Sequence, residues 1–145
     1  MSIDIEAVRT ADEELVAAFA RLLPQLSRTA TPLDREALAR LLACDSNTLL
    51  TARLDGTVVG ALTLVLSPLP SGLRARVEDV VVDTAARGHG IGAALLDQAL
   101  KLARAAGART VDLTSHPTRQ AANRLYERAG FQPRESTVHR VTLDG

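Results

Sequence analysis

By length and composition the chain is expected to form one domain, because it has 145 residues and 46% of them are hydrophobic, enough to build a core. With one Tyr, two Phe, no Trp and 17 basic against 17 acidic residues, it lacks the stacking surface and the excess positive charge of a nucleic-acid or membrane binder. We therefore expect a single domain over residues 1–145 with neither kind of partner.

The hydrophobic pattern predicts strands alternating with helices. Strands are indicated by apolar alternation or β-branched runs, and helices by apolar residues at helical spacing between capping and breaking residues. In chain order the predicted elements are a strand at 2–8, helices at 12–23 and 34–43, a hairpin at 48–66, a strand at 74–83, a helix at 90–106, a strand at 109–115, a helix at 117–129 and one or two strands within 131–143.

Turn and breaker residues set the expected boundaries. Pro24 should end the first helix, and Asp55-Gly56 suits a tight hairpin turn because both residues tolerate positive φ. The run SPLPSG at 67–72 is expected to be a loop. The order β-α-α-β-β-β-α-β-α-β(β) predicts an α/β fold, a mixed sheet with helices packed on it, in which the strands at 74–83 and 109–115 are parallel.

Cysteine content and the N-terminal sequence bear on the compartment. The single cysteine, Cys44, cannot form an intramolecular disulfide and fits a reducing environment. The run MSIDIEAVRTADEE has no basic segment followed by an apolar one, and no apolar run approaches a membrane span in length. Three histidines and one cysteine show no metal-ligand spacing. We expect a cytoplasmic monomer or homodimer without a metal site.

A glycine cluster follows the strand at 74–83. In ARGHGIG, Gly88, Gly90 and Gly92 stand where a helix begins, although glycine costs a helix roughly 1 kcal/mol relative to alanine. A helix N-terminus presents unpaired N–H groups and a partial positive charge, and glycines let an anion approach them. Arg87 adds a guanidinium suited to phosphate oxygens. The cluster therefore indicates a pyrophosphate site; the alternative is a flexible loop without a ligand.

Two ligand motifs overlap in this cluster. Gly88, Gly90 and Ala93 satisfy the dinucleotide fingerprint G-x-G-x-x-[GA], and Asp112 is suitably spaced for a ribose contact. Against that motif, residues 84–87 separate the fingerprint from its strand, and too little chain follows to complete a doubly wound domain. The other motif is RGHGIG at 87–92, which has the form R-x-x-G-x-G.

This second motif resembles the pyrophosphate loop of the GNAT superfamily of acetyl-CoA-dependent N-acyltransferases, [QR]-x-x-G-x-[GA]. The run VEDVVVD resembles the family's fourth strand, NRLYERAGF at 123–131 resembles its late helix, and the resemblance covers essentially the whole chain. Thr84 is a departure, since a proline is common there. The resemblance implies a GNAT-like fold with splayed fourth and fifth strands, and acetyl-CoA as the acetyl donor.

The resemblance also implies how the donor is bound. The pantetheine arm would lie between the splayed strands and pair with the backbone of Val80 and Val82, and the pyrophosphate would lie on the glycine loop. The implied cofactor-binding residues are Val80, Val81, Val82, Arg87, Gly88, His89, Gly90, Ile91, Gly92, Ala93 and Asn123.

Tyr126 and Glu78 are the catalytic candidates. The resemblance implies that Tyr126, the only tyrosine, protonates the departing thiolate, although its spacing also fits packing. Glu78 is the candidate base or amine anchor because a carboxylate inside an apolar strand is costly unless it is used or paired. By strict alternation it shares a face with Val80, whereas Asp79 points the other way. An ion pair of Glu78 with a neighbouring arginine is the alternative.

The predicted activity is transfer of the acetyl group of acetyl-CoA to a primary amine of a small molecule or peptide, by direct attack in a ternary complex. The alternative is a non-catalytic acyl-CoA-binding or regulatory module, which would need neither Glu78 nor Tyr126. The resemblance places the acceptor between residues 23–33 and 132–142. Arginines in these segments indicate an acceptor with a carboxylate or phosphate, unless they are merely solvated: Arg28, Arg134 and Arg140.

Overall fold

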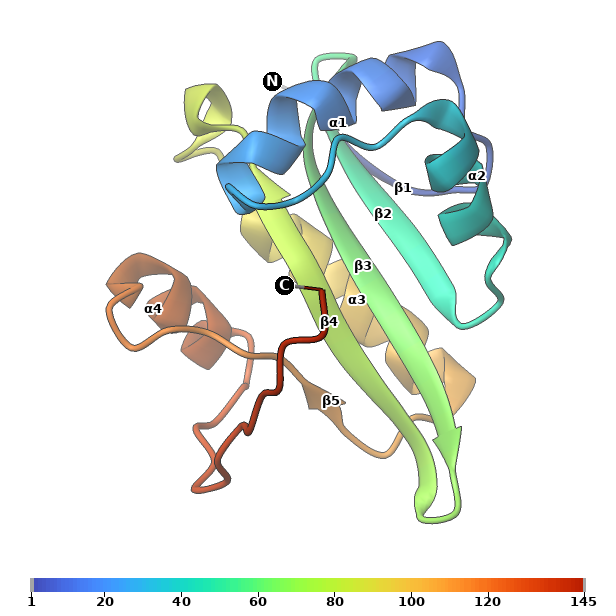
Figure 1. The fold of residues 1–145 in the computed structure, drawn as a ribbon. Helices are drawn as coiled ribbons and strands as arrows, with labels where there is room; N and C mark the ends of the chain where they lie inside the picture. Colours follow the sequence, from blue (N-terminus) through green and yellow to red (C-terminus); the bar gives the residue numbers. More distant parts are fainter. Residues whose placement is uncertain (1, 145) are drawn as a thin grey trace.

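The computed structural model describes residues 2–144, and its strands form one sheet in the order β1-β2-β3-β4-β5 (Figure 1). Neighbouring strands are antiparallel except for β4 and β5, which are parallel as predicted. The strands are β1 (Ile3–Val8), β2 (Asn47–Leu54), β3 (Thr57–Leu69), β4 (Gly72–Val82) and β5 (Val111–Asp112). The expected mixed-sheet α/β fold is confirmed.

Helices cover both faces of the sheet. They are α1 (Glu13–Leu26), α2 (Arg35–Ala43), α3 (Ile91–Ala106) and α4 (Gln120–Arg128), with a short 3₁₀ turn, η1 (Thr84–Ala86). One core lies under α1 and α2, around Leu22 and Leu38, and the other lies under α3, around Leu95 and Leu96. Figure 1 shows α1 and α2 in front of the sheet and α3 behind it. No helix within residues 2–144 is both long and apolar enough to cross a membrane.

Aspartate caps begin α1 and α2 where the sequence predicts. Asp12 and Asp34 each accept a hydrogen bond, at 2.8 Å, from the backbone N–H three residues along the chain. Such a cap typically stabilises a helix by ~1 kcal/mol. The prediction that Pro24 ends α1 is wrong, since the helix continues to Leu26. Proline fixes φ at about −65°, which is a helical value, so Pro24 can lie in the last turn at the cost of one backbone hydrogen bond and a crowded preceding turn.

The two hairpins are tight. Asp55 and Gly56 link β2 to β3 with φ values of 50° and 89°, as the sequence predicts. The loop expected at 67–72 is mostly strand, because β3 runs on to Leu69 and β4 begins at Gly72. Pro68 lies beyond the last pair between β2 and β3, which involves Val65. An unpaired edge is therefore available there for a residue that lacks an N–H.

The chain after α3 is less regular than predicted. Of the strand expected at 109–115 only Val111–Asp112 forms, and α4 begins at Gln120 rather than at 117. The strands expected within 131–143 do not form. With two residues, β5 offers too short an edge for a further strand to pair with, and the apolar side chains of the C-terminal segment stay largely exposed, at Val138, Val141 and Leu143.

Candidate active site

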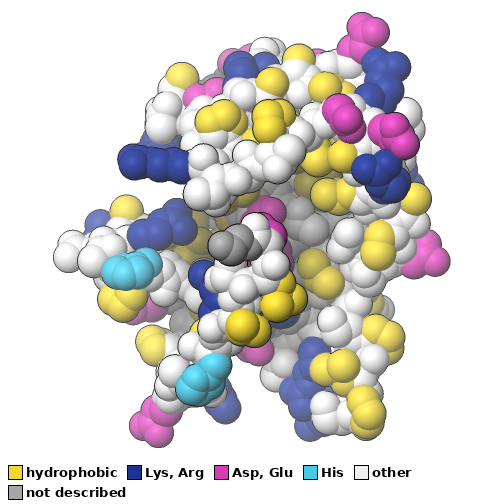
Figure 2. Space-filling model, viewed as in Figure 1, with side chains coloured by type: hydrophobic (Ala, Val, Ile, Leu, Met, Phe, Trp, Pro, Cys, Tyr) yellow, Lys and Arg dark blue, Asp and Glu magenta, His cyan; other side chains and the backbone are white. Residues whose placement is uncertain are grey.

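A gap opens between β4 and β5, as splayed strands require. The two strands pair only at Ala75↔Val111 and Arg76↔Asp112, and then diverge. A cavity of about 190 Å³, here called the donor cavity, occupies the divergence. It is lined by Leu26 of α1, residues 77–80 of β4, Leu113 and Thr114 after β5, and Arg119 and Tyr126 at α4. Figure 2 shows this face hollowed between the part that carries α1 and α2 and the part that carries α4.

A β-bulge in β4 shapes this cavity. Ala61 of β3 pairs with Val81 and Thr63 pairs with Glu78, so both Asp79 and Val80 stand opposite the one residue between them on β3. Asp79 has a φ of +51°, a left-handed conformation that aspartate tolerates better than most residues. The bulge inserts one extra residue into β4, which shifts the alternation of everything that follows it.

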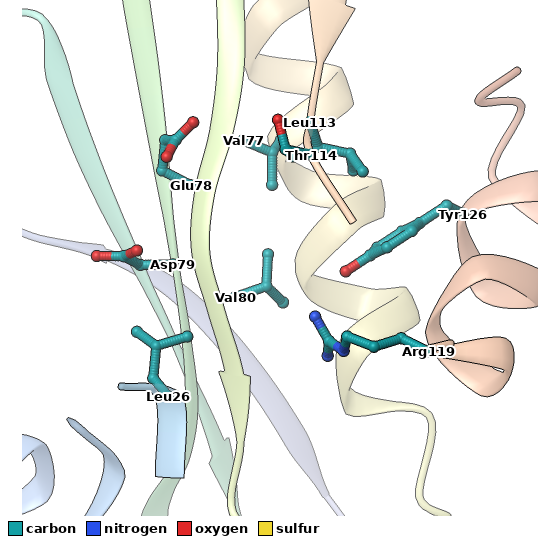
Figure 3. A pocket seen from close by; sticks show the side chains of 9 residues that line it. All are labelled: Leu26, Val77, Glu78, Asp79, Val80, Leu113, Thr114, Arg119 and Tyr126. Atoms are coloured by element: carbon teal, nitrogen blue, oxygen red, sulfur yellow. The ribbon is translucent and has the colours of Figure 1, made fainter. Parts of the chain in front are cut away.

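The bulge overturns the predicted orientation of Glu78. Strict alternation places Glu78 on the same face as Val80 and turns Asp79 away. Instead, Glu78 and Asp79 lie on one side of β4, and Val77 and Val80 lie on the other, facing Leu113 and Tyr126 (Figure 3). The core contacts agree, since Val77, Val80 and Val82 pack with the α3 core whereas Val81 packs with the α1 core. The cause is the extra residue at the bulge, which breaks the alternation.

The bulge also turns backbone groups of β4 toward the gap. The Ala75 N–H donates to Thr110 on the β5 side at 3.0 Å, whereas the Asp83 N–H donates to Val59 on the β3 side at 2.7 Å. The N–H groups of successive residues point to alternate sides of a strand, so those of Ala75 and Asp83, both odd-numbered, would point to the same side in a regular strand. Because they point to opposite sides, the alternation is reversed once between them, at the bulge. After the reversal, the backbone N–H and C=O groups of Val80 and Val82 face the gap, where β5 has already ended.

The glycine loop continues from this edge. It runs through η1 to Gly88 and Gly90, whose φ values of +86° and +76° are left-handed. A Cβ atom at either glycine would meet no heavy atom within 4 Å, so the loop surface is open. Gly90 begins α3 without a side-chain cap, unlike the aspartates that begin α1 and α2. The first-turn N–H groups of α3 are therefore free for an anion.

The predicted cofactor-binding residues of the loop divide by position. Arg87, His89 and Ala93 are exposed, while the Ile91 side chain is only 2% exposed and belongs to the α3 core. Gly92 serves packing, because a Cβ there would stand 3.0 Å from the Leu125 Cδ2 atom of α4. The three glycines look equivalent in the sequence motif, but in the structure Gly88 and Gly90 face open space whereas Gly92 lies against Leu125.

The two carboxylates of the donor cavity differ in their surroundings. Glu78 Oε1 accepts a hydrogen bond from Arg76 Nε at 2.9 Å, in a half-exposed ion pair, and Arg76 Nη2 also donates to Thr114 Oγ1 at 3.1 Å. This pairing fixes the direction of the Glu78 carboxylate. Partial burial raises the pKa of the Asp79 carboxyl above its ordinary value, and the negative charge of Glu78 adds to that rise.

α4 brings its own side chains to the opposite wall. Tyr126 is 8% exposed and packs edge-to-face on Phe131, with ring centroids 6.2 Å apart. Its hydroxyl and the Arg119 guanidinium both point toward β4 near Val80 (Figure 3). Asn123 Nδ2 donates to the His116 carbonyl oxygen at 3.1 Å and so holds the approach to α4.

Sequence reasoning missed Arg119. The prediction of a helix from 117 places this residue inside the helix, with no reason to face a ligand. In the structure Arg119 is the residue at the N-cap of α4, and its side chain lines the donor cavity. The signal in the sequence was Pro117, because a turn after this proline delays the start of the helix.

Comparisons with known proteins agree with this geometry. The model of a family described as "Acetyltransferase (GNAT) family" matches residues 12–131. A mycothiol acetyltransferase from Beutenbergia cavernae is 34% identical over 79 residues. That match covers 54% of this chain and 26% of the relative, so it spans only about a quarter of that protein.

Solved structures share the fold. A transcriptional regulator from Bacillus halodurans has a TM-score of 0.79 at 28% identity, over 97% of this chain and 100% of its own. Two more distant structures show the fold alone. An aminoglycoside acetyltransferase from an uncultured soil metagenomic sample, in complex with sisomicin, has a TM-score of 0.83 at 20% identity. The match covers 97% of this chain and 95% of that one. A ribosomal-protein-alanine N-acetyltransferase from Brucella melitensis has a TM-score of 0.79 at 23% identity, and the match covers 99% of this chain and 100% of that one.

The family match begins at the cap of α1 and ends just after α4, so it spans the glycine loop and both walls of the donor cavity. On this ground, the chain belongs to the GNAT acetyltransferase family.

Proposed function

We propose that this protein is an N-acetyltransferase that transfers the acetyl group of acetyl-CoA to a primary amine of a small molecule or peptide, by direct attack in a ternary complex. The observation that carries the proposal is a continuous polar path. It runs from the open backbone edge at Val80 and Val82, through the glycine loop, to the uncapped start of α3. Family membership supports the acetyl transfer itself.

The residues along this path fit acetyl-CoA. The amides of a pantetheine arm would pair with the backbone of Val80 and Val82 as an added strand does, while Val81, paired with Ala61, keeps β4 in its sheet. This mode needs backbone groups and no particular side chain, which suits a run of valines. The length of the gap beyond Arg76 leaves that edge free for a ligand.

The pyrophosphate would lie at the far end of the path. Free N–H groups from Gly90 to Ala93 and the positive end of the α3 dipole favour an anion there. The exposed Arg87 guanidinium adds charge-assisted hydrogen bonds, with His89 beside it. Asn123, whose amide nitrogen already holds the α4 approach, has its side-chain oxygen left for the donor.

The chemistry begins with the amine. A free alkylammonium has a pKa of about 10.4, so it must lose a proton before it can attack at neutral pH. We assign that proton to Glu78, whose carboxylate is oriented by Arg76 at the donor cavity. The neutral nitrogen then attacks the thioester carbonyl carbon and forms the C–N bond.

After the attack the nitrogen of the addition product still carries one extra proton, which it loses to water. Collapse of the addition product then breaks the C–S bond and needs an acid. The Tyr126 hydroxyl points into the donor cavity from the wall opposite the carboxylates (Figure 3), and we assign to it the proton that neutralises the departing thiolate. The buried ring held on Phe131 fixes the direction of that hydroxyl.

Thiol release from acetyl-CoA, measured across a panel of primary amines with mass analysis of the products, tests the proposal. The expected result is amine-dependent thiol release with an N-acetylated product. Tight acetyl-CoA binding without transfer to any amine would instead identify a non-catalytic acyl-CoA module. Thermal stabilisation by NAD and not by acetyl-CoA would instead favour the interpretation of the glycine loop as a dinucleotide site.

A further inference from the structure

A second cavity, here called the acceptor cavity, lies between α1, α2 and the sheet. Its volume is about 220 Å³, and its wall is formed mainly by leucines of α1, α2, β2 and the segment between the two helices, together with Phe19. Figure 2 shows hydrophobic side chains gathered along the upper wall of the hollow, under α1 and α2. The remaining lining residues include Thr31, Thr63 and a single ionisable residue, Asp79.

Asp79 connects the two cavities. It lines both of them, as does Leu26 at the end of α1. The left-handed φ at the bulge turns the Asp79 side chain to the same side of β4 as Glu78, away from Val80 and Tyr126 (Figure 3). A molecule in the acceptor cavity therefore meets the donor cavity at a carboxylate, next to a second carboxylate.

From this arrangement we propose that the acceptor is a primary amine carried on an apolar group: its ammonium binds Asp79, and its apolar group fills the acceptor cavity. This inference rests on the N-acetyltransferase function proposed above. Burial of apolar atoms against leucines is favourable, whereas hydroxyl or phosphate groups in the same place would lose water and find only Thr31, Thr63 and Asp79 as polar partners. A cation is complementary to the one ionisable side chain in the lining.

The arginines that indicate an anionic acceptor in the sequence lie elsewhere. Arg28, Arg134 and Arg140 are exposed, and none of them lines either cavity. No residue of 132–142 lines the two cavities either, so that predicted boundary of the acceptor is not seen in residues 2–144. An acceptor with a carboxylate or phosphate in the acceptor cavity would meet Asp79 without a compensating cation in the lining of that cavity.

The test is a comparison of kcat/KM across matched amines with the wild-type protein. The apolar series is ethylamine, butylamine, hexylamine and phenethylamine, and the polar set is ethanolamine, glucosamine and sisomicin. We expect kcat/KM to rise about fourfold per added methylene until the cavity is filled. Leucinamide should exceed both glycinamide and leucine, since only leucinamide joins an apolar side chain to an amine without a carboxylate.

Two variants locate the effect. Ala30, an exposed lining residue, can be enlarged without entering the core, so Ala30→Phe should reduce the preference for hexylamine over ethylamine at least about tenfold. Asp79→Asn should raise the KM for every amine while leaving the Kd for acetyl-CoA unchanged. Asp97→Asn, on the outer face of α3, is the control that changes neither.

The outcomes separate this inference from the function on which it rests. Acetylation of glucosamine or sisomicin as efficiently as hexylamine would overturn the apolar acceptor while the N-acetyltransferase function stands. An unchanged amine KM in Asp79→Asn would overturn the ammonium contact. Acetyl-CoA binding with no acetylation of any amine in either set would contradict the proposed function itself.

Discussion

Tyr126 packs edge-to-face on Phe131, with an angle of 67° between the rings and 6.2 Å between their centroids. The contact involves only the ring of Tyr126, and the hydroxyl, which points toward Val80, takes no part in it (Figure 3). Within residues 2–144, no hydrogen bond fixes this hydroxyl to another side chain or to the backbone. The ring and the hydroxyl can therefore be tested separately.

Tyr126→Phe should reduce kcat by roughly 10²–10³-fold, the usual contribution of a general acid. The melting temperature and the KM for acetyl-CoA should hardly change, because phenylalanine keeps the ring contact with Phe131. Steady-state kinetics with thiol detection and a thermal melt make the comparison. An unchanged rate of thiol release would remove the acid role from Tyr126.

Glu78→Gln keeps an oxygen for Arg76 but removes the proton acceptor. We expect kcat/KM at pH 7 to fall by roughly 10²–10³-fold. The remaining activity should then climb steadily with pH, because without a base the enzyme depends on the fraction of amine already neutral in solution. A pH–rate profile from pH 6 to 10 measures this. If Asp79→Asn gives that profile and Glu78→Gln does not, the base is Asp79.

Gly90 and Gly107 form a matched pair at the two ends of α3. Both have left-handed φ values, +76° and +86°, and a Cβ at either one would meet open space. Alanine should therefore strain the backbone equally at the two sites, by ~1–2 kcal/mol. Only Gly90→Ala should weaken acetyl-CoA binding, by about tenfold or more in a calorimetric titration, since only this glycine lies in the phosphate path. Equal loss of affinity in both variants would refute the phosphate cradle.

The ionised carboxylate of Asp79 should lower the stability of the folded protein at neutral pH. Burial and the charge of Glu78 raise its pKa in the folded state above the unfolded value. The folded state then binds this proton more tightly, so the contribution to stability falls as pH rises from the unfolded pKa through the folded one. Asp79→Asn, which also tolerates positive φ, should raise Tm at pH 7.5 by roughly 1–4 °C.

That gain should disappear at a pH below the unfolded pKa of aspartate, near 3.9, where the wild-type carboxyl is also protonated. Asp97→Asn on α3 should show no such gain at either pH. A lower Tm for Asp79→Asn at pH 7.5 would mean that the carboxylate stabilises the bulge. A functional group that destabilises its own fold is expected where the site was selected for chemistry.

The glycine loop and the helix caps could be predicted from sequence because they depend on neighbours in the chain. Asp12, Asp34, the Asp55-Gly56 turn and the positive φ of Gly88 and Gly90 all follow from local conformational preference. The splayed strands came from resemblance to a family.

The parts that failed depend on distant contacts or on a single backbone exception. Nothing in VEDVVVD marks the bulge, since Asp79 has neither a glycine nor a proline beside it, and so alternation predicted the wrong face for Glu78. The role of Gly92 depends on Leu125, which belongs to another helix. The C-terminal segment has strand-forming residues, but a strand also needs an edge to pair with.

Amide hydrogen exchange at three consecutive valines of β4 tests the placement of acetyl-CoA most directly. The N–H groups of Val80 and Val82 face the gap, while that of Val81 faces β3 by the same alternation. Saturating acetyl-CoA should slow exchange at Val80 and Val82, together with Gly90 and its neighbours at the start of α3, and leave Val81 unchanged. If acetyl-CoA binds and exchange at Val80 and Val82 does not slow, the donor does not lie along β4 and the account is wrong.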